Sequence, residues 1–271
     1  MSDRVIVHQQ EGVADVRLNR PEKMNALDPA MFEALVETGR ALAAEPSLRV
    51  VVLSGEGRAF CAGLDFASFM GMAERRGAGG APPPRSLLDR DGSVANHAQQ
   101  SAYVWSEMPV PVIAAVHGVA FGGGLQIALA ADIRFVAPTA QLSVMEIKWG
   151  LIPDMTGSQT LRRLVRLDVA KELTFTGRII FGNEAAALGL ATHVSENPHD
   201  DALTLAREIA AKSPDAIRAG KQLLNSAGLV SLAEGLSLEE RLQLSLIGKP
   251  NQMEAVQANV QKRAPSFRDP Q

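Results

Sequence analysis

The stretch from Val112 to Ile133 constrains the fold of this chain more than any other segment. It begins as an apolar run, breaks at the consecutive glycines Gly122, Gly123 and Gly124, and resumes in helix-forming residues. This order predicts a strand, a tight turn and a buried helix. Glycines at such a turn permit positive φ, and the first N–H groups of the new helix lack intrahelical partners. The turn is a candidate site for an anionic oxygen, or else its glycines only let strand and helix pack closely.

A second glycine turn occurs earlier in the chain. The apolar run from Arg49 to Leu53 predicts a buried strand, which leads into Ala62, Gly63 and Leu64. Two turns that present free backbone N–H groups to one oxygen would stabilise an enolate or a tetrahedral oxyanion. This hypothesis requires that two turns far apart in the sequence meet in space.

The other apolar patterns predict a mixed α/β chain that becomes entirely helical near residue 200. Asp28 before Pro29 is typical of a helix N-terminus, and glycines and prolines between Gly71 and Gly92 indicate a mobile loop. The further expected elements are a hairpin over Val5–Val7 and Val13–Leu18, strands over Ile133–Ala137, Gln141–Ile147 and Thr192–Ser195, and helices over Ser93–Met108, Val169–Phe175, Asn183–Leu188, Asp201–Lys212, Pro214–Ser226, Leu232–Ile247 and Met253–Lys262.

Composition excludes several function classes. The net charge is −3 and the basic residues are scattered, so we expect no nucleic-acid partner. No run reaches the roughly 18 uninterrupted apolar residues that a membrane span needs, and the N-terminal residues lack a signal-peptide core. Cys61 is the single cysteine, and the five histidines show no metal-ligand spacing. We therefore expect a cytoplasmic protein without a membrane partner, an internal disulfide or a metal site.

Motifs in a characteristic order extend over nearly the whole chain. They are Arg17–Pro21 with Asn25–Leu27, Ala59–Asp65, His117-Gly118 with Phe121–Leu125, Glu146 with Gly150–Pro153, and finally Lys262–Phe267. Together they resemble the enoyl-CoA hydratase/isomerase family, the crotonase superfamily.

The resemblance implies an α/β fold, a crotonase-like spiral of ββα turns. Residues 1–199 would form this core with the acyl-CoA site, and residues 200–271 a helical region that builds trimers, commonly paired into hexamers. The implied substrate is a coenzyme A thioester, which brings coenzyme A with it, so no separate cofactor is expected.

The resemblance also implies which residues form the site. The backbone N–H groups of Leu64 and Gly123 would form the oxyanion hole around the thioester carbonyl. The nucleotide end of coenzyme A would lie against a loop and a turn, with help from the C-terminus of the same or a neighbouring subunit. The residues concerned are Lys23, Ala26, Leu27, Ala62, Asp65, Lys262 and Phe267.

The acid/base positions depart from those of the hydratases that the chain resembles. Those enzymes use two glutamates to hold and activate a water, whereas here Gln126 stands at the first position and Glu146 at the second. Glutamine keeps the shape but cannot carry a proton, and losing one general acid/base partner typically costs about 10²- to 10⁴-fold. The glutamine is either natural or an engineered replacement of glutamate. Asp154 is either an N-cap or an acid like that found at this position in dienoyl-CoA isomerases.

Four functions remain open from the sequence. The first is an enzyme acting on a 2-enoyl-CoA, with Glu146 as the base and Gln126 orienting water. The second is an isomerase in which Glu146 alone moves a proton between Cα and Cγ. The third, suggested by bacterial crotonase relatives, is a dehydratase or desaturase that leads to a cis-2-unsaturated fatty-acid signal. The fourth is a protein that binds a CoA thioester without turnover.

Overall fold

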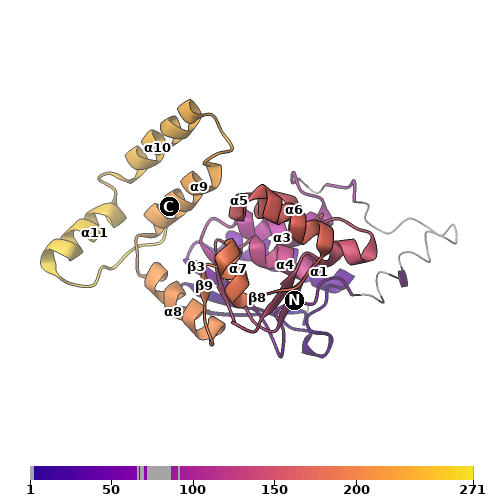
Figure 1. Ribbon diagram of the computed structural model, residues 1–271. Coiled ribbons are helices and arrows are strands. Elements are labelled where there is room, and N and C mark those ends of the chain that lie inside the picture. The colour runs from indigo at the N-terminus through magenta and orange to yellow at the C-terminus, as the bar shows by residue number, and fades with distance from the viewer. Residues whose placement is uncertain (1–2, 66, 68–69, 72–86, 91, 271) are drawn as a thin grey trace.

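The computed structural model describes residues 3–65, 67, 70–71, 87–90 and 92–270, so most of the predicted loop between Gly71 and Gly92 lies outside the described residues. Strands and helices are interspersed as far as residue 194, and the elements after it are all helical. Figure 1 shows that helices surround the strands, whereas α10 and α11 extend away from this body. The predicted α/β class is confirmed, as is the change to an all-helical region.

The main sheet has six strands in the order β1-β2-β3-β4-β6-β9. β1 and β2 form the predicted antiparallel hairpin, and the other neighbours are parallel. A second sheet has the order β5-β7-β8. The bounds are β1 Val5–Gln10, β2 Val13–Leu18, β3 Val50–Gly55, β4 Val112–Val116, β5 Val119–Phe121, β6 Ile133–Val136, β7 Gln141–Ser143, β8 Ile180–Phe181 and β9 His193–Val194.

The α-helices follow the predicted segments closely, whereas the two 3₁₀ helices lie where the sequence predicts a loop and the end of a strand. Asp28 caps α1 by accepting a hydrogen bond from the amide of Met31 at 2.8 Å, as the Asp-Pro pair predicts. The bounds are η1 Pro21–Lys23, α1 Pro29–Ala43, α3 His97–Glu107, α4 Gly123–Leu129, η2 Met145–Trp149, α5 Gly157–Leu164, α6 Leu167–Thr176, α7 Gly182–Leu188, α8 Pro198–Ala210, α9 Pro214–Ser226, α10 Leu232–Leu246 and α11 Pro250–Gln261, where η denotes a 3₁₀ helix.

Both faces of β3 are covered, which explains its unbroken apolar sequence. Val51 and Leu53 point into the larger core, and Val50 and Val52 point into a smaller one shared with α8. α8 packs against β2, β3, β4 and β6. It lies on both sides of the predicted division at residue 199, and that division remains a prediction.

The strand predicted over the run that begins at Val112 is in fact two strands in different sheets. β4 belongs to the main sheet and β5 to the smaller one. Gly118 lies between them with φ of 61°, and a β-carbon there would overlap the carbonyl oxygen of Arg58. Only glycine fits this redirection of the chain.

The strand predicted over Gln141–Ile147 is wrong beyond Ser143. Ser143 pairs with Phe121, where β5 ends, so the ladder has no further partner there in the described part of the chain. The following residues form η2 instead, which ends at Gly150 in the left-handed conformation.

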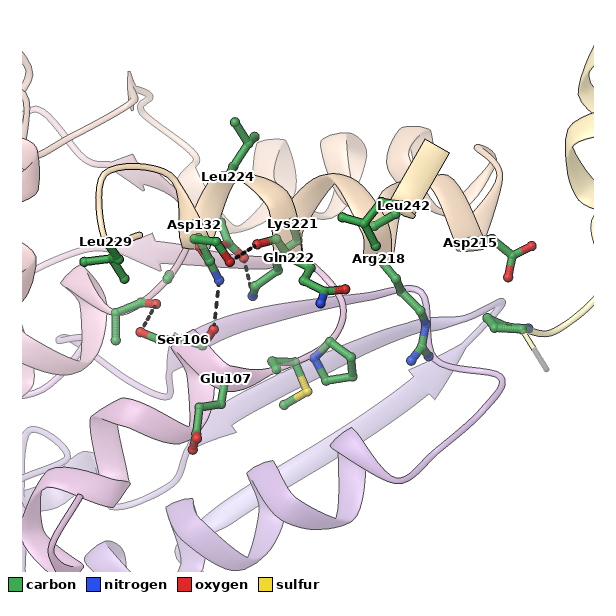
Figure 2. A pocket seen from close by; sticks show the side chains of 18 of the residues that line it. Ser106, Glu107, Asp132, Asp215, Arg218, Lys221, Gln222, Leu224, Leu229 and Leu242 are labelled. Carbon is green, nitrogen blue, oxygen red and sulfur yellow. Dashed lines mark hydrogen bonds and ion pairs between the residues drawn. The ribbon is translucent and has the colours of Figure 1, made fainter. Parts of the chain in front are cut away.

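A buried lysine joins α9 to the body of the protein. Lys221 donates to the carboxylate of Asp132 at 2.7 Å (Figure 2). It also donates to the carbonyl oxygen of Val110 at 3.0 Å. A cleft of about 1200 Å³ lies between the body and the helices α9 and α10, and both polar and apolar residues line it, including Glu107 and Leu242. The cleft is separate from the two glycine turns, because neither turn contributes to its lining.

Candidate active site

The loop that ends at Leu27 and the turn at Gly63 are joined through their backbones. The amide of Leu27 donates to the carbonyl of Gly63 at 2.8 Å, and the amide of Asp65 donates to the carbonyl of Leu27 at 3.0 Å. The amide of Ala62 donates to Met24 at 2.9 Å. The structure therefore brings together the two segments predicted to hold the nucleotide end of coenzyme A.

The side chains at this junction differ in exposure. Lys23 is exposed at the end of η1, whereas Ala26 and Leu27 are buried. The carboxylate of Asp65 accepts a hydrogen bond from the guanidinium of Arg20 at 2.6 Å, and the same nitrogen reaches the carbonyl of Ala26 at 3.2 Å. Asp65 therefore anchors the loop through Arg20, and its predicted contact with coenzyme A stays a prediction.

Asn25 organises this loop, a role that the sequence reasoning missed. Its buried side-chain amide donates to the carbonyls of Glu56, Ala59 and Phe60 at 2.9, 2.8 and 3.2 Å. Its side-chain oxygen accepts from the amide of Arg20 at 2.8 Å, and its φ is 56°. The available signal was an asparagine in a polar loop, since asparagine tolerates the left-handed conformation and bonds to nearby backbone.

We expect Asn25→Ala to destabilise the protein by about 3 kcal/mol, because it leaves buried carbonyls unpaired and places alanine at positive φ. Urea denaturation followed by circular dichroism measures the change. Asn197→Ala is the control, because Asn197 is exposed and its side chain does not cap α8. Equal stability of the two variants would contradict the role of Asn25.

The two glycine turns lie side by side. Cys61 pairs with Ala120 in a parallel bridge, and the amide of Phe121 donates to the carbonyl of Cys61 at 3.1 Å. A β-carbon built on Gly63 would lie 2.6 Å from the carbonyl oxygen of Phe121 and 3.8 Å from the Cα of Gly122. The meeting of the turns that the oxyanion hypothesis requires is therefore present.

The amides predicted to bind the thioester oxygen are available at this junction. Within the described residues, the backbone hydrogen bonds of the turns use neither the amide of Leu64 nor that of Gly123. Gly123 is the first residue of α4, where an amide has no intrahelical acceptor. The helix terminus also favours negative charge.

The carboxyl group of Glu146 lies directly against the glycine turn at Gly122–Gly124. A β-carbon on Gly122 would be 3.2 Å from its Oε1 atom and 3.6 Å from its carboxyl carbon. Oε1 accepts a hydrogen bond from Gln126, whereas Oε2 is buried and has no hydrogen-bond partner in the described part of the protein. Burial raises the pKa of Glu146 above its usual value, and its own amide and Gln126 oppose that shift.

Gln126 contacts Glu146 directly from α4. Its Nε2 donates to Oε1 of Glu146 at 2.6 Å, and its side-chain oxygen accepts from the amides of Met155 and Gly157 at 2.8 and 2.9 Å. At 2.6 Å no water can stand between Nε2 and Oε1. Gln126 therefore orients no water between itself and Oε1. Whether it orients a water beside Oε2 of Glu146 remains untested.

Asp154 is close enough to Glu146 to raise the pKa of that carboxyl further. The residue as a whole is exposed, but burial of its carboxyl group still raises its own pKa. The N-cap interpretation of Asp154 is wrong, because α5 begins at Gly157 and its N-cap residue is Thr156. The amides of Met155 and Gly157, which follow Asp154, donate to the side-chain oxygen of Gln126 and not to Asp154.

Two C-terminal residues, Lys262 and Phe267, are predicted to contact coenzyme A. Lys262 ends α11 in the left-handed conformation and is exposed, and Phe267 is half-buried in the segment that follows. Figure 1 shows α11, which ends just before Lys262, far from α4. The segment that contains Phe267 is bonded to α11, because the amide of Arg268 donates to the side-chain oxygen of Asn251 at 2.9 Å. Their contribution from a neighbouring subunit stays a prediction.

The described residues favour neither a cysteine nucleophile nor a metal site. The thiol of Cys61 is buried and donates to the carbonyl of Asn25 at 3.1 Å, and burial raises its pKa to about 12, so it is a poor nucleophile. Among the described residues no group of three or more His, Cys, Asp or Glu side chains is arranged to hold a metal ion. None of the helices described there has the length and apolar character for crossing a membrane.

Comparison with known proteins gives a consistent result. The model of the family described as enoyl-CoA hydratase/isomerase matches residues 8–270. The mitochondrial methylglutaconyl-CoA hydratase of Mus musculus is 33% identical over 98% of this chain and 82% of its own length. The crystal structure of an enoyl-CoA hydratase from Bacillus anthracis is 32% identical, with a TM-score of 0.87 over 97% of this chain and 98% of that one. With its two adjoining glycine turns and a glutamate beside them, this chain belongs to the enoyl-CoA hydratase/isomerase family and has its crotonase fold.

Proposed function

We propose that this enzyme moves a proton at the α-carbon of an enoyl-CoA thioester. Glu146 acts as acid and base, and the amides of Leu64 and Gly123 bind the oxygen of the enolate. The observation that carries the proposal is the position of the Glu146 carboxyl, which lies against Gly122, the residue before one of these amides. An α-carbon next to the bound carbonyl would then be close to the base.

The proposed chemistry uses the two oxygens of Glu146 differently. Oε1 is occupied by Gln126, whereas the unpartnered Oε2 can take a proton. When the Cα–H bond breaks, its electron pair moves into the enolate and the proton passes to Oε2. The substrate brings its own coenzyme A along the loop and turn at Leu27 and Gly63, and the reaction as proposed uses no separate cofactor.

Gln126 favours one reaction within the family, the migration of a double bond. An amide cannot deliver or take up a proton near neutral pH, so Glu146 would work alone. In a 3-enoyl thioester the proton leaves Cα and returns at Cγ, which leaves a double bond between Cα and Cβ. One carboxyl suffices for both steps. Hydration of a 2-enoyl thioester would in addition need a reactant water on the Oε2 side, and Asp154 rather than Gln126 would have to serve as its second acid/base group.

Spectrophotometric assays with short- and medium-chain thioesters test this function. Loss of absorbance of a 2-enoyl-CoA reports hydration, and gain of the same absorbance from a 3-enoyl-CoA reports isomerisation. We expect turnover, with a higher rate for the 3-enoyl substrate than for the 2-enoyl substrate. Formation of a cis-2-enoyl product from a 3-hydroxyacyl thioester would instead indicate a dehydratase, and tight CoA binding without any turnover would contradict the proposal.

We also propose that the protein is a homo-oligomer, a trimer or a dimer of trimers. The helices that extend from the body carry large exposed apolar side chains, including Leu232, Leu244 and Val260, which a solvent-exposed surface rarely gathers. Light scattering tests the proposal, which a monomeric mass would contradict. The cytoplasmic location stays a prediction.

A further inference from the structure

Gln126 is held by backbone groups whose chemistry determines how its amide is oriented. The amides of Met155 and Gly157 both point at one atom of this side chain, at 2.8 and 2.9 Å. A backbone N–H can only donate, so that atom must be the oxygen and not the nitrogen. The two bonds occupy both lone pairs of the oxygen. The side chain is buried, so water cannot replace them readily.

The local backbone is specialised for this contact. Thr156, between the two donors, has φ of 73°, an unusual conformation for a β-branched residue. A β-carbon on Gly157 would lie 2.6 Å from the side-chain oxygen of Gln126, so the approach requires glycine. Amides on either side of a left-handed residue form a concavity that also binds negatively charged oxygens.

The opposite end of the Gln126 amide therefore faces Glu146 as a donor. Nε2 carries only hydrogens, and Oε1 of Glu146 accepts one of them at 2.6 Å. A donor at this distance favours the ionised carboxyl over the protonated one. The contact opposes the effect of burial on Glu146.

We infer that Gln126 is a positioning residue that keeps Glu146 ionised, so that Glu146 meets its substrate as a base. The catalytic consequence of this inference rests on the proposed function. An ionised Glu146 in the free enzyme suits a substrate whose α-proton must leave first, such as a 3-enoyl thioester. A glutamate at position 126 would reverse the arrangement. One oxygen of its carboxylate would accept hydrogen bonds from the two amides, and the other would face Oε1 of Glu146. The two carboxyl groups would then have to share a proton.

Among the residues that the structure describes, few other charges surround Glu146. Asp154 acts against ionisation, and α4 carries no charged residue. On η2 itself, the ammonium group of Lys148 lies 5.9 Å from the Trp149 ring. The helix packed against η2 is α6, in which Asp168 pairs with Arg166, Glu172 pairs with Arg178 and Lys171 is exposed. The residue at position 126 is therefore the neighbour best placed to set the proton occupancy of Glu146.

Carboxyl ¹³C NMR of protein labelled at glutamate side chains tests the inference without requiring turnover. The Glu146 resonance is assigned by its loss in Glu146→Gln, and its titration is compared in the wild type, Gln126→Glu and Gln126→Met. We expect Glu146 to be ionised at pH 7 in the wild type. In Gln126→Glu we expect two coupled steps, with the upper midpoint at least about one pH unit above the wild-type value. In Gln126→Met a single step moves upward, because the donor is lost.

Gln159→Glu is the matched control, because Gln159 is exposed on α5 and bonds to Ser158 rather than to Glu146. It should leave the Glu146 midpoint unchanged. Should Gln126→Glu fail to fold, the methionine variant still decides the question. A Glu146 midpoint that is the same in every folded variant, or a protonated Glu146 in the wild type at pH 7, would overturn the inference. Absence of thioester turnover with the expected titration would contradict only the proposed function.

Discussion

Glu146→Gln is expected to lower kcat by about 10²- to 10⁴-fold, the usual contribution of a positioned acid or base. Glutamine keeps the size of the side chain and can still accept a hydrogen bond from Gln126, but it cannot take a proton from the α-carbon. KM should change much less, because the proposed coenzyme A contacts lie at Leu27 and Gly63. Steady-state kinetics with the substrate found in the thioester assays measures both constants.

Glu33→Gln is the control for this change, since Glu33 is an exposed residue of α1. It should retain wild-type kinetics. If Glu146→Gln kept more than a tenth of the wild-type kcat, Glu146 would not be the acid/base residue.

The pH dependence of the wild-type enzyme follows from the environment of Glu146. Only the ionised carboxyl can take a proton, so kcat/KM should fall as the pH drops through the pKa of this group. Burial raises that pKa. The acidic limb should therefore lie above the ordinary glutamate value of about 4.3. A limb at or below this value would show that a different group governs the reaction.

Gly124→Ala is expected to lower kcat/KM by about 100-fold or more. A β-carbon at this position would overlap the carbonyl oxygen of Cys61 and lie 2.7 Å from the Cys61 β-carbon. A backbone carbonyl cannot rotate away, so α4 and the strand segment must separate. The amides of Leu64 and Gly123 would then no longer converge, and a displacement of about 1 Å can cost 10²-fold in rate.

The same substitution should also destabilise the protein by about 1–3 kcal/mol through overpacking, which denaturant unfolding measures. Gly220→Ala is the matched control in α9, because a β-carbon there meets no atom within 4 Å. It should raise stability by about 1 kcal/mol and leave turnover unchanged, since alanine favours helix over glycine. Wild-type kcat/KM in Gly124→Ala would show that the close packing of the two turns is dispensable.

Local patterns predicted most of the secondary structure because they report local physics. The Asp28-Pro29 pair marks the start of α1, and the apolar run at Val50–Leu53 marks a strand covered on both faces. The predicted bounds were wrong where contacts with other segments determine where an element begins or ends. β7 stops at Ser143 because β5 has ended, and α5 begins only at Gly157, where the amide of Met155 and that of Gly157 itself donate to Gln126. Neither partner can be read from the segment itself.

The sequence by itself determined the family, the two glycine turns and the identities of Gln126 and Glu146, because these depend on residue types in order along the chain. Only the tertiary structure decided that the turns adjoin, that Asn25 supports one of them, and that the nitrogen of Gln126 faces Glu146. The reason is physical. The orientation of a buried amide depends on which donors surround it, and here those donors are backbone groups about thirty residues further along the chain.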